Sequence, residues 1–418
     1  MKKIKITSIL LCFSLLLAAT VGFGGCDTDH SASLLTPPND LKVDFTELGN
    51  EEKVAVLQSD FAGALLSHAV AKDPDKNLLL SPLSVMLALS MTANGATNQT
   101  LDEMEAVLGG VPVEELNAVL GAYLQKISLD EKLKIANSIW FRENLKVKEQ
   151  VLATCSDYSG AEVYRSPFTQ ATVKEINDWV NKHTDGMIEE IVKEITPDNM
   201  MFLINALCFD AKWKDPYDPL KDVSTQPFYR EDGSSDVDFM HSLEHQYIKT
   251  DTATGFIKDY EGDFSFVALL PNEGISVEDY LSMLSPYDLL DAIQNAEDRS
   301  VFASLPKFSY EFETEMSAIL TEMGMPTAFL RNQATFGKMT GGTPELFISK
   351  VIHKTNISVD TGGTVAAAAT SVTMDLYSAS AEIMLDSPPH VVLNRPFVYM
   401  IIDNTTSIPL FAGVVTNP

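Results

Sequence analysis

The stretch MFLINALCFDAKW, residues 201–213, is a long and nearly continuous apolar run. A strand with both faces buried has this composition, so the run predicts a strand in the middle of a large sheet. Upstream of it, residues 133–141 predict another strand. Downstream, the apolar stretches 397–402 and 409–415 flank polar residues 404–406, a pattern typical of a β-hairpin.

Helical signals are concentrated in the first half of the chain. Ser81 and Pro82 begin a helix well, because Ser caps the first turn and Pro fits the first helical position. The residues that follow, up to Asn94 and Gly95, are apolar on every face, which predicts a buried helix. An amphipathic helix is predicted over residues 176–183. Because helices come early and strands late, the pattern favours an α+β fold.

Composition and charge limit the classes of function. Of the 418 residues, 45% are hydrophobic, which is enough apolar material for a sizeable core. The formal net charge is −28, from 58 acidic and 30 basic residues. Because Lys and Arg neutralise phosphate backbones, no nucleic-acid partner is expected. No composition break or repeat follows residue 51, so residues 51–418 are predicted to form one domain.

The N-terminus has the layout of an export signal. Three lysines precede an apolar run over residues 9–19, which is too short to span a membrane comfortably. The small residues before Cys26 resemble the lipobox of bacterial lipoproteins, in which this cysteine becomes lipid-modified. Residues 1–25 are therefore predicted to be a lipoprotein-type signal peptide and residues 26–50 a linker; plain secretion is the alternative. The protein is expected to be extracellular or held at the cell surface, with no membrane contact other than the lipid.

Signatures of catalysis are few. The sequence contains no G-x-S-x-G, Walker or G-x-G-x-x-G motif. The H-x-x-E-H spacing of His241 and His245 matches inverted zinc peptidases, whose histidines must share a helix, but the flanking residues predict strand and turn. No enzyme, metal or cofactor is therefore expected. Cys155 and Cys208 are either buried thiols or a single disulfide.

Residues 359–389, VDTGGTVAAAATSVTMDLYSASAEIMLDSPP, carry contradictory signals. Four consecutive alanines favour helix, yet two glycines precede them and β-branched residues follow. In a strand, Thr364, Ala366, Ala368 and Thr370 would share one face, and all four are small. Such a strand could slide between two neighbours with little steric cost; a surface loop or linker is the alternative.

The blocks around this stretch resemble the serpin family in order and spacing, from about residue 51 to residue 418. They are NLLLSPLS at 77–84, IANSIW at 135–140, INDWV at 176–180, LPKF at 305–308, ISKVIHK at 348–354, RPFV at 395–398 and PLFAG at 409–413. The resemblance implies the serpin fold, with a large, mostly antiparallel central sheet, additional sheets, a bundle of helices and an exposed reactive-centre loop.

The resemblance also implies a mechanism. A protease cleaves the exposed loop and forms its acyl-enzyme, and the freed loop then inserts into the central sheet and distorts the trapped protease. The hinge of that loop is assigned to Gly363, Thr364, Val365, Ala366, Ala367, Ala368, Ala369 and Thr370. The cluster beneath the opening strands, where hydrogen bonds must break and re-form, is assigned to Ser81, Ser84, Asn205, Trp213 and His353.

The usual distance from the hinge places the scissile bond between Tyr377 and Ser378. Because the loop is longer than the family norm, there are alternatives, namely Leu376, Met374 and the Leu385–Asp386 bond. An aromatic or apolar bait residue suits serine proteases of chymotrypsin or subtilisin type, and cysteine proteases are a further class.

The sequence thus predicts an exported suicide inhibitor that forms a covalent complex with its target protease. It is expected to be a monomer that can swap loops into polymers. The alternative is a non-inhibitory serpin that acts as a binding protein or a protease substrate.

Overall fold

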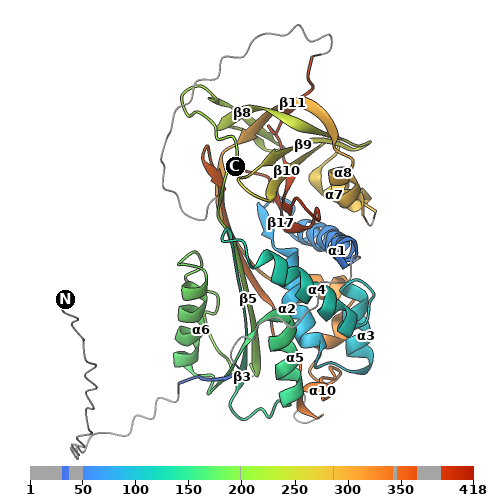
Figure 1. Cartoon of the computed structure of the whole chain (residues 1–418), viewed down its shortest axis with the longest axis vertical. Helices are drawn as coiled ribbons and strands as arrows, with labels where there is room; N and C mark the ends of the chain where they lie inside the picture. The colour runs from blue at the N-terminus through green and yellow to red at the C-terminus, as the bar shows by residue number, and fades with distance from the viewer. Residues whose placement is uncertain (1–30, 37–49, 198, 286, 342–345, 365–386) are drawn as a thin grey trace, which may run out of the picture. The chain divides into compact units, whose positions relative to one another are not determined.

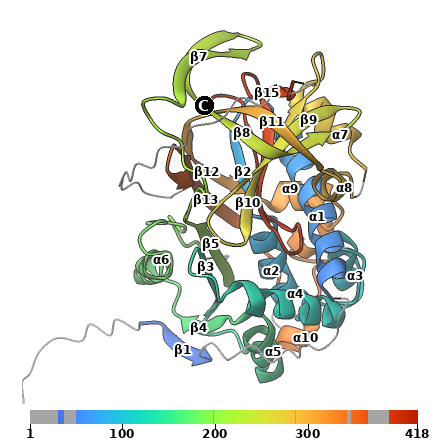
Figure 2. The same cartoon turned by 45° about the horizontal axis from the view of Figure 1, so that its top comes forward.

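The computed structural model describes residues 31–36, 50–197, 199–285, 287–341, 346–364 and 387–418. Within these residues the strands form two four-stranded sheets and one nine-stranded sheet, and helices pack against them (Figures 1 and 2). The α+β class predicted from the sequence is confirmed.

The two four-stranded sheets are halves of one layer. The first has the order β1 (Ser33–Thr36), β4 (Glu162–Ser166), β3 (Leu133–Arg142) and β5 (Met201–Phe209). The second has the order β12 (Phe308–Glu315), β13 (Ile352–Val359), β14 (Gly363–Thr364) and β6 (Ala211–Lys212). Residues 201–213, predicted as one strand, run through β5 and then β6, so this stretch belongs to both halves. The exposed Asp210 interrupts it, and its amide donates to the Lys132 carbonyl over 3.0 Å.

The nine-stranded sheet contains the predicted C-terminal hairpin. Its order is β15 (His390–Val392), β11 (Glu297–Pro306), β8 (Gly233–Lys249), β9 (Ala253–Asp259), β10 (Phe264–Pro271), β16 (Phe397–Asp403), β17 (Pro409–Val415) and β2 (Leu78–Leu80), with β7 (Val223–Arg230) paired to β8. Each residue of β10, β16 and β17 is buried, as expected for strands that are apolar on both faces.

The helices of the described residues follow here in chain order. They are α1 (Asn50–Lys72), α2 (Pro82–Ala93), α3 (Asn98–Val107), α4 (Val113–Ile127), α5 (Glu149–Ser159), α6 (Gln170–His183), α7 (Val277–Met283), α8 (Asp288–Gln294), α9 (Ser317–Glu322), α10 (Gly337–Thr340) and the 3-10 helix η1 (Pro326–Phe329). The predicted cap of α2 is confirmed, because the Ser81 side chain accepts from the Ser84 amide over 3.3 Å. Every residue of α2 is buried.

The half-sheet of β3 and β5 lies between two helical layers (Figure 1). Helix α6 covers one face, where Ile176 and Trp179 contribute to a core shared with Trp140 on β3. Helices α2 and α5 lie on the opposite face, within the larger core. Both faces of β5 are therefore buried, which explains its nearly unbroken apolar sequence.

Part of the predicted linker is structured instead. Of residues 26–50, Ser33–Thr36 form strand β1, which pairs antiparallel with β4 and extends the edge of the sheet. The Ala32 amide donates to both carboxylate oxygens of Glu175 on α6, each over 3.1 Å. An edge strand has unpaired backbone groups, and this four-residue segment satisfies those of β4. Residues 1–30 and 37–49, including Cys26, lie outside the described residues.

Substitutions at two glycines, one with no room for a side chain and one with room, test this packing. A Cβ on Gly413 of β17 would lie 2.5 Å from the Leu78 carbonyl oxygen and 2.6 Å from the Tyr399 ring, whereas one on Gly63 of α1 would make an ordinary 3.6 Å contact. We expect Gly413→Ala to lower the free energy of unfolding by about 1–3 kcal/mol through overpacking. The control, Gly63→Ala, should raise it by about 0.5–1 kcal/mol through helix propensity. Urea unfolding of both variants measures this, and equal destabilisation would contradict the packing described here.

Candidate functional site

Among the described residues, no strand pairs with both halves of the central layer along its length. Strands β5 and β13 lie next to each other, yet they belong to different half-sheets. Of the residues that the structure describes, the two of β14 alone bridge the halves, at one end, where Thr364 pairs with Val359 of β13 and with Ala211 of β6. Both pairings are antiparallel. A longer strand that continued β14 would therefore run antiparallel to β13 and β5 and would have to separate them.

A tight turn delivers the chain to this opening. The Asp360 carboxylate accepts from the amides of Gly362 and Gly363, over 2.7 and 3.3 Å, and the Asp360 amide donates to the Gly363 carbonyl over 3.0 Å. On the other side of the turn, the Trp213 amide donates to the Gly362 carbonyl over 3.0 Å and the Tyr217 amide to the Thr361 carbonyl over 3.0 Å. These bonds fix the direction in which the chain enters the sheet. We call residues 360–364 the hinge turn.

The first hinge residues fit a confined space. A Cβ on Gly363 would lie 2.3 Å from the Ala211 carbonyl oxygen and 2.7 Å from the Lys212 Cα, so only glycine allows this backbone approach. Thr364 is buried, and its hydroxyl forms a 2.5 Å hydrogen bond with the Tyr260 hydroxyl. The sequence prediction that the hinge needs small residues is consistent with both positions. Val365 to Thr370, the rest of the predicted hinge, lie outside the described residues.

Four of the five residues predicted for the cluster beneath the opening strands do meet. The Ser81 amide donates to His353 Nε2 over 3.1 Å, which links α2 to β13. The Ser84 hydroxyl donates to the Asn205 side chain, which links α2 to β5. Since β5 and β13 are the strands that must separate, these bonds hold the opening closed from below.

The cluster extends further than sequence reasoning found. The Asn205 amide donates to the Asn137 side chain on β3, and the Asn137 amide donates to the Ser159 carbonyl at the end of α5 over 2.6 Å. Asn137 and Asn205 are direct partners in the β3–β5 pairing. The available signal was the polar pair Asn137 and Ser138 inside the run IANSIW, since a buried amide needs partners.

Trp213, the fifth predicted member, lies elsewhere. Its indole Nε1 donates to the Asp360 carbonyl over 2.8 Å, so it contacts the hinge turn and none of the serines. Its ring stacks on Tyr260 with centroids 4.4 Å apart. Trp213 is eight residues beyond Asn205 along the same stretch of chain, which places it at the other end of the opening.

Burial changes the acid–base behaviour of His353. The side chain is only 5% exposed, and desolvation lowers its pKa to about 4. The neutral ring accepts the Ser81 amide hydrogen through Nε2. A protonated ring could not accept it, so this bond depends on the neutral state.

The predicted bait residues belong to the segment between Thr364 and Ser387. Tyr377, Ser378 and the alternatives Leu376, Met374, Leu385 and Asp386 lie outside the described residues. The chain is described again from Ser387, and it joins the nine-stranded sheet through β15. There the Phe302 amide donates to the Pro389 carbonyl over 2.8 Å. The two anchors of the loop are thus the hinge turn and β15.

His241 and His245 both lie on strand β8. Four residues along a strand separate them by about 13 Å, so they do not form the helical pair of a zinc peptidase. His241 instead forms hydrogen bonds with the hydroxyls of Ser224, over 2.7 Å, and Ser304, over 2.9 Å. Among the described residues, no group of His, Cys, Asp and Glu side chains could hold a metal ion.

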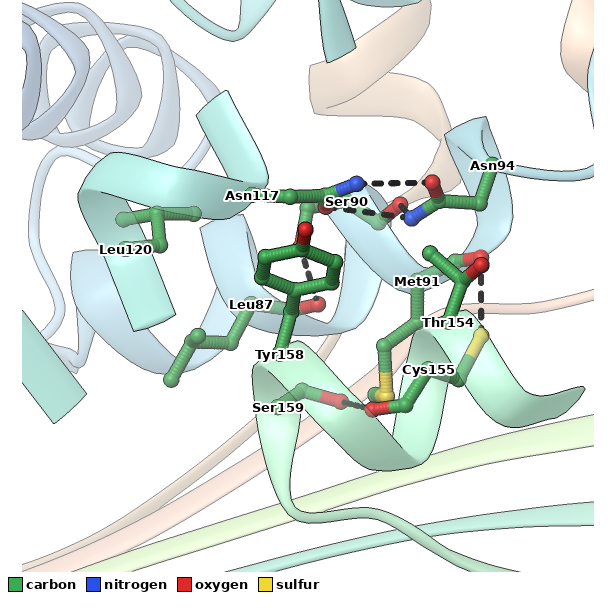
Figure 3. Close-up of a pocket in the computed structure, with 10 residues that line it drawn as sticks. All are labelled: Leu87, Ser90, Met91, Asn94, Asn117, Leu120, Thr154, Cys155, Tyr158 and Ser159. Atoms are coloured by element: carbon green, nitrogen blue, oxygen red, sulfur yellow. Dashed lines mark hydrogen bonds between the residues drawn. The ribbon is translucent and has the colours of Figure 1, made fainter. Parts of the chain in front are cut away.

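Cys155 and Cys208 are separate buried thiols, and burial raises the pKa of each to about 12. The disulfide considered from the sequence is therefore absent. Cys155 borders a cavity of about 10 Å³ between α2, α4 and α5 (Figure 3), where Asn94 and Asn117 exchange side-chain hydrogen bonds of 3.1 and 2.7 Å. A cavity of this size holds at most about one water molecule, which excludes it as a ligand site.

Comparison with known proteins agrees with this geometry. The family model described as Serpin (serine protease inhibitor) matches residues 56–418. Alpha-1-antichymotrypsin from Homo sapiens is 31% identical over 401 residues, which cover 92% of each chain. The crystal structure of tengpin, a thermophilic serpin, in its native state is 40% identical, with a TM-score of 0.85 over 93% of this chain and 100% of that one. A loop C-sheet serpin polymer is 38% identical, with a TM-score of 0.75 over 90% of this chain and 98% of that one.

The residues matched by the family model include β5, β13, the hinge turn and the polar cluster. Protease inhibitors of the serpin family bind target proteases and are not enzymes. The chain belongs to the serpin family.

Proposed function

We propose that this serpin is an exported suicide inhibitor of serine endopeptidases of the chymotrypsin or subtilisin type. The observation that carries the proposal is the missing strand between β5 and β13, begun by β14 and continuous with the loop. Cleavage of the loop would free its hinge side to enter the sheet. The covalently attached protease would then be carried along β5 and distorted before it could hydrolyse the acyl bond.

The register of β14 supports Tyr377–Ser378 as the bait bond. Gly363 faces Lys212 and Thr364 faces Ala211, so an inserted strand that continued this register would bring residue 374 opposite Met201, the first residue of β5. A bond after Tyr377 would leave a short connection to the protease at the far end of the sheet. A bond after Leu385 would leave a longer connection that holds the protease less tightly.

An aromatic bait residue suits the apolar specificity pocket of chymotrypsin-like and subtilisin-like enzymes. The relative named alpha-1-antichymotrypsin agrees with this target class. Cysteine proteases are a second class for the same bait. Export, a lipid anchor on Cys26 and a monomer that can form loop-swapped polymers complete the proposal, and the polymeric relative supports the last point.

Hinge variants test the proposed mechanism. Because Thr364 points into the buried interior, Ala366 on the same strand face would also be buried after insertion, whereas Val365 would point the other way. Mixed with chymotrypsin or subtilisin, the wild-type protein should give a band at the summed mass on a denaturing gel and release a C-terminal peptide that begins at Ser378.

Ala366→Arg should turn the inhibitor into a substrate, because a buried unpaired charge would stop insertion. Val365→Arg is the matched control and should still form the complex. Cleavage of the wild-type protein without a complex would instead indicate a non-inhibitory serpin that acts as a binding protein or substrate.

The low pKa of His353 predicts acid sensitivity. In the unfolded chain the His353 ring takes up a proton near pH 6.5, whereas in the native protein it does so only near pH 4. The contribution of His353 to the free energy of unfolding is therefore present at neutral pH and is lost as the pH falls between these two values. At pH 5 this loss is about 2 kcal/mol relative to pH 7.5.

We expect the urea midpoint of the wild-type protein to fall between pH 7.5 and 5 more steeply than that of His353→Gln. A variant at an exposed histidine, His390→Gln, is the control and should keep the wild-type slope. Identical slopes in all three proteins would show that His353 is not the responsible group.

A further inference from the structure

A lysine is buried behind the hinge turn. Lys258 on β9 is 2% exposed and is among the largest fully buried side chains of the described residues. Its ammonium is 2.8 Å from a carboxylate oxygen of Glu244 on β8, whose side chain is 12% exposed. A buried ion pair is costly to desolvate, and apolar residues of similar volume are often as stable, so stability alone is a weak reason for it.

Within the described ranges, the other contacts of this ammonium lie on one segment of chain. Lys258 Nζ donates to the Asp215 carbonyl over 3.1 Å. It also lies 4.5 Å from the ring centroid of Tyr217 and 5.4 Å from that of Trp213, both within cation–π range. The two rings are perpendicular, with centroids 6.3 Å apart. One charge therefore fixes three positions of the segment 213–217.

The same segment holds the hinge turn. The amides of Trp213 and Tyr217 donate to the carbonyls of Gly362 and Thr361, and the Trp213 indole donates to the Asp360 carbonyl. Each aromatic residue that faces the ammonium is thus also a donor to the turn from which the loop enters the sheet. A shift of the rings would move these donors directly.

We propose that Lys258 and Glu244 are positioning residues for loop insertion, acting on the hinge turn through Trp213 and Tyr217. This inference rests on the proposed inhibitory function. The ion pair keeps the segment 213–217 in the arrangement that aims Gly363 and Thr364 between β13 and β6. Without it, the loop would enter more slowly, and more acyl-enzyme would be hydrolysed before the protease is trapped.

The decisive variant is the double substitution Lys258→Met with Glu244→Leu, made in the full chain. It leaves no unpaired buried charge, so the protein should fold with a Tm equal to or above that of the wild type. Lys214→Met is the matched control. Lys214 lies on the same segment 213–217 and its ammonium pairs with Asp259 over 2.9 Å, but its side chain is 62% exposed.

Two readouts separate positioning from a merely structural role. Hydrogen exchange followed by mass spectrometry should show faster exchange in the peptide that contains residues 211–217, by about tenfold in the double variant. The stoichiometry of inhibition, measured with chymotrypsin or subtilisin, should rise by about threefold or more. The control should match the wild type in both.

Wild-type exchange and wild-type stoichiometry in the double variant would overturn the proposal. If the wild-type protein traps no protease, the proposed function fails, and the exchange measurement still decides whether the ion pair positions the hinge turn. Unchanged exchange in that case would also overturn the proposal.

Discussion

A central sheet that is one strand short is the constraint on which the rest of this structure depends. In the part of the chain that the structure describes, β14 joins β13 to β6 at one end, and β5 and β13 belong to different sheets. The edges of these two strands favour pairing with any strand that reaches them, because unpaired backbone groups are costly when buried. The fold therefore needs elements that keep the space closed and others that guide the correct strand into it. The polar cluster serves the first purpose and the hinge turn the second.

These two elements rely on different physical chemistry. The polar cluster joins α2 to both strands through neutral hydrogen bonds, one of which needs His353 to stay unprotonated. Such bonds can break and re-form as the strands separate. The hinge turn relies on geometry that allows no adjustment, since Gly363 touches the backbone of β6 where any side chain would collide. Behind it, the buried charge of Lys258 fixes the aromatic residues that hold the turn.

Much of this architecture could be predicted because the local sequence patterns, such as helix caps and apolar runs, agree with the burial of these elements in the folded protein. The cap at Ser81 and the continuous apolar residues behind it specify a buried helix, and residues 201–213 specify a central strand. The serpin resemblance supplied the order of the blocks and the hinge. What it could not supply was distance along a strand: Trp213 and Asn205 share one run of sequence but lie at opposite ends of the opening.

Strand β1 was missed because four residues with little apolar pattern pair through their backbone. The Lys258–Glu244 pair was missed because two charges on separate strands give no sequence signal.

The central claim is that the space between β5 and β13 accepts the loop as a strand. The most direct test is the Tm of the intact protein compared with that of the same protein after a single cut in the loop and removal of the protease. An inserted strand would complete the sheet, so the cleaved form should unfold at a temperature higher by at least about 10 °C. An equal or lower Tm after cleavage would contradict the account, because a cut loop that stays outside the sheet adds no hydrogen bonds.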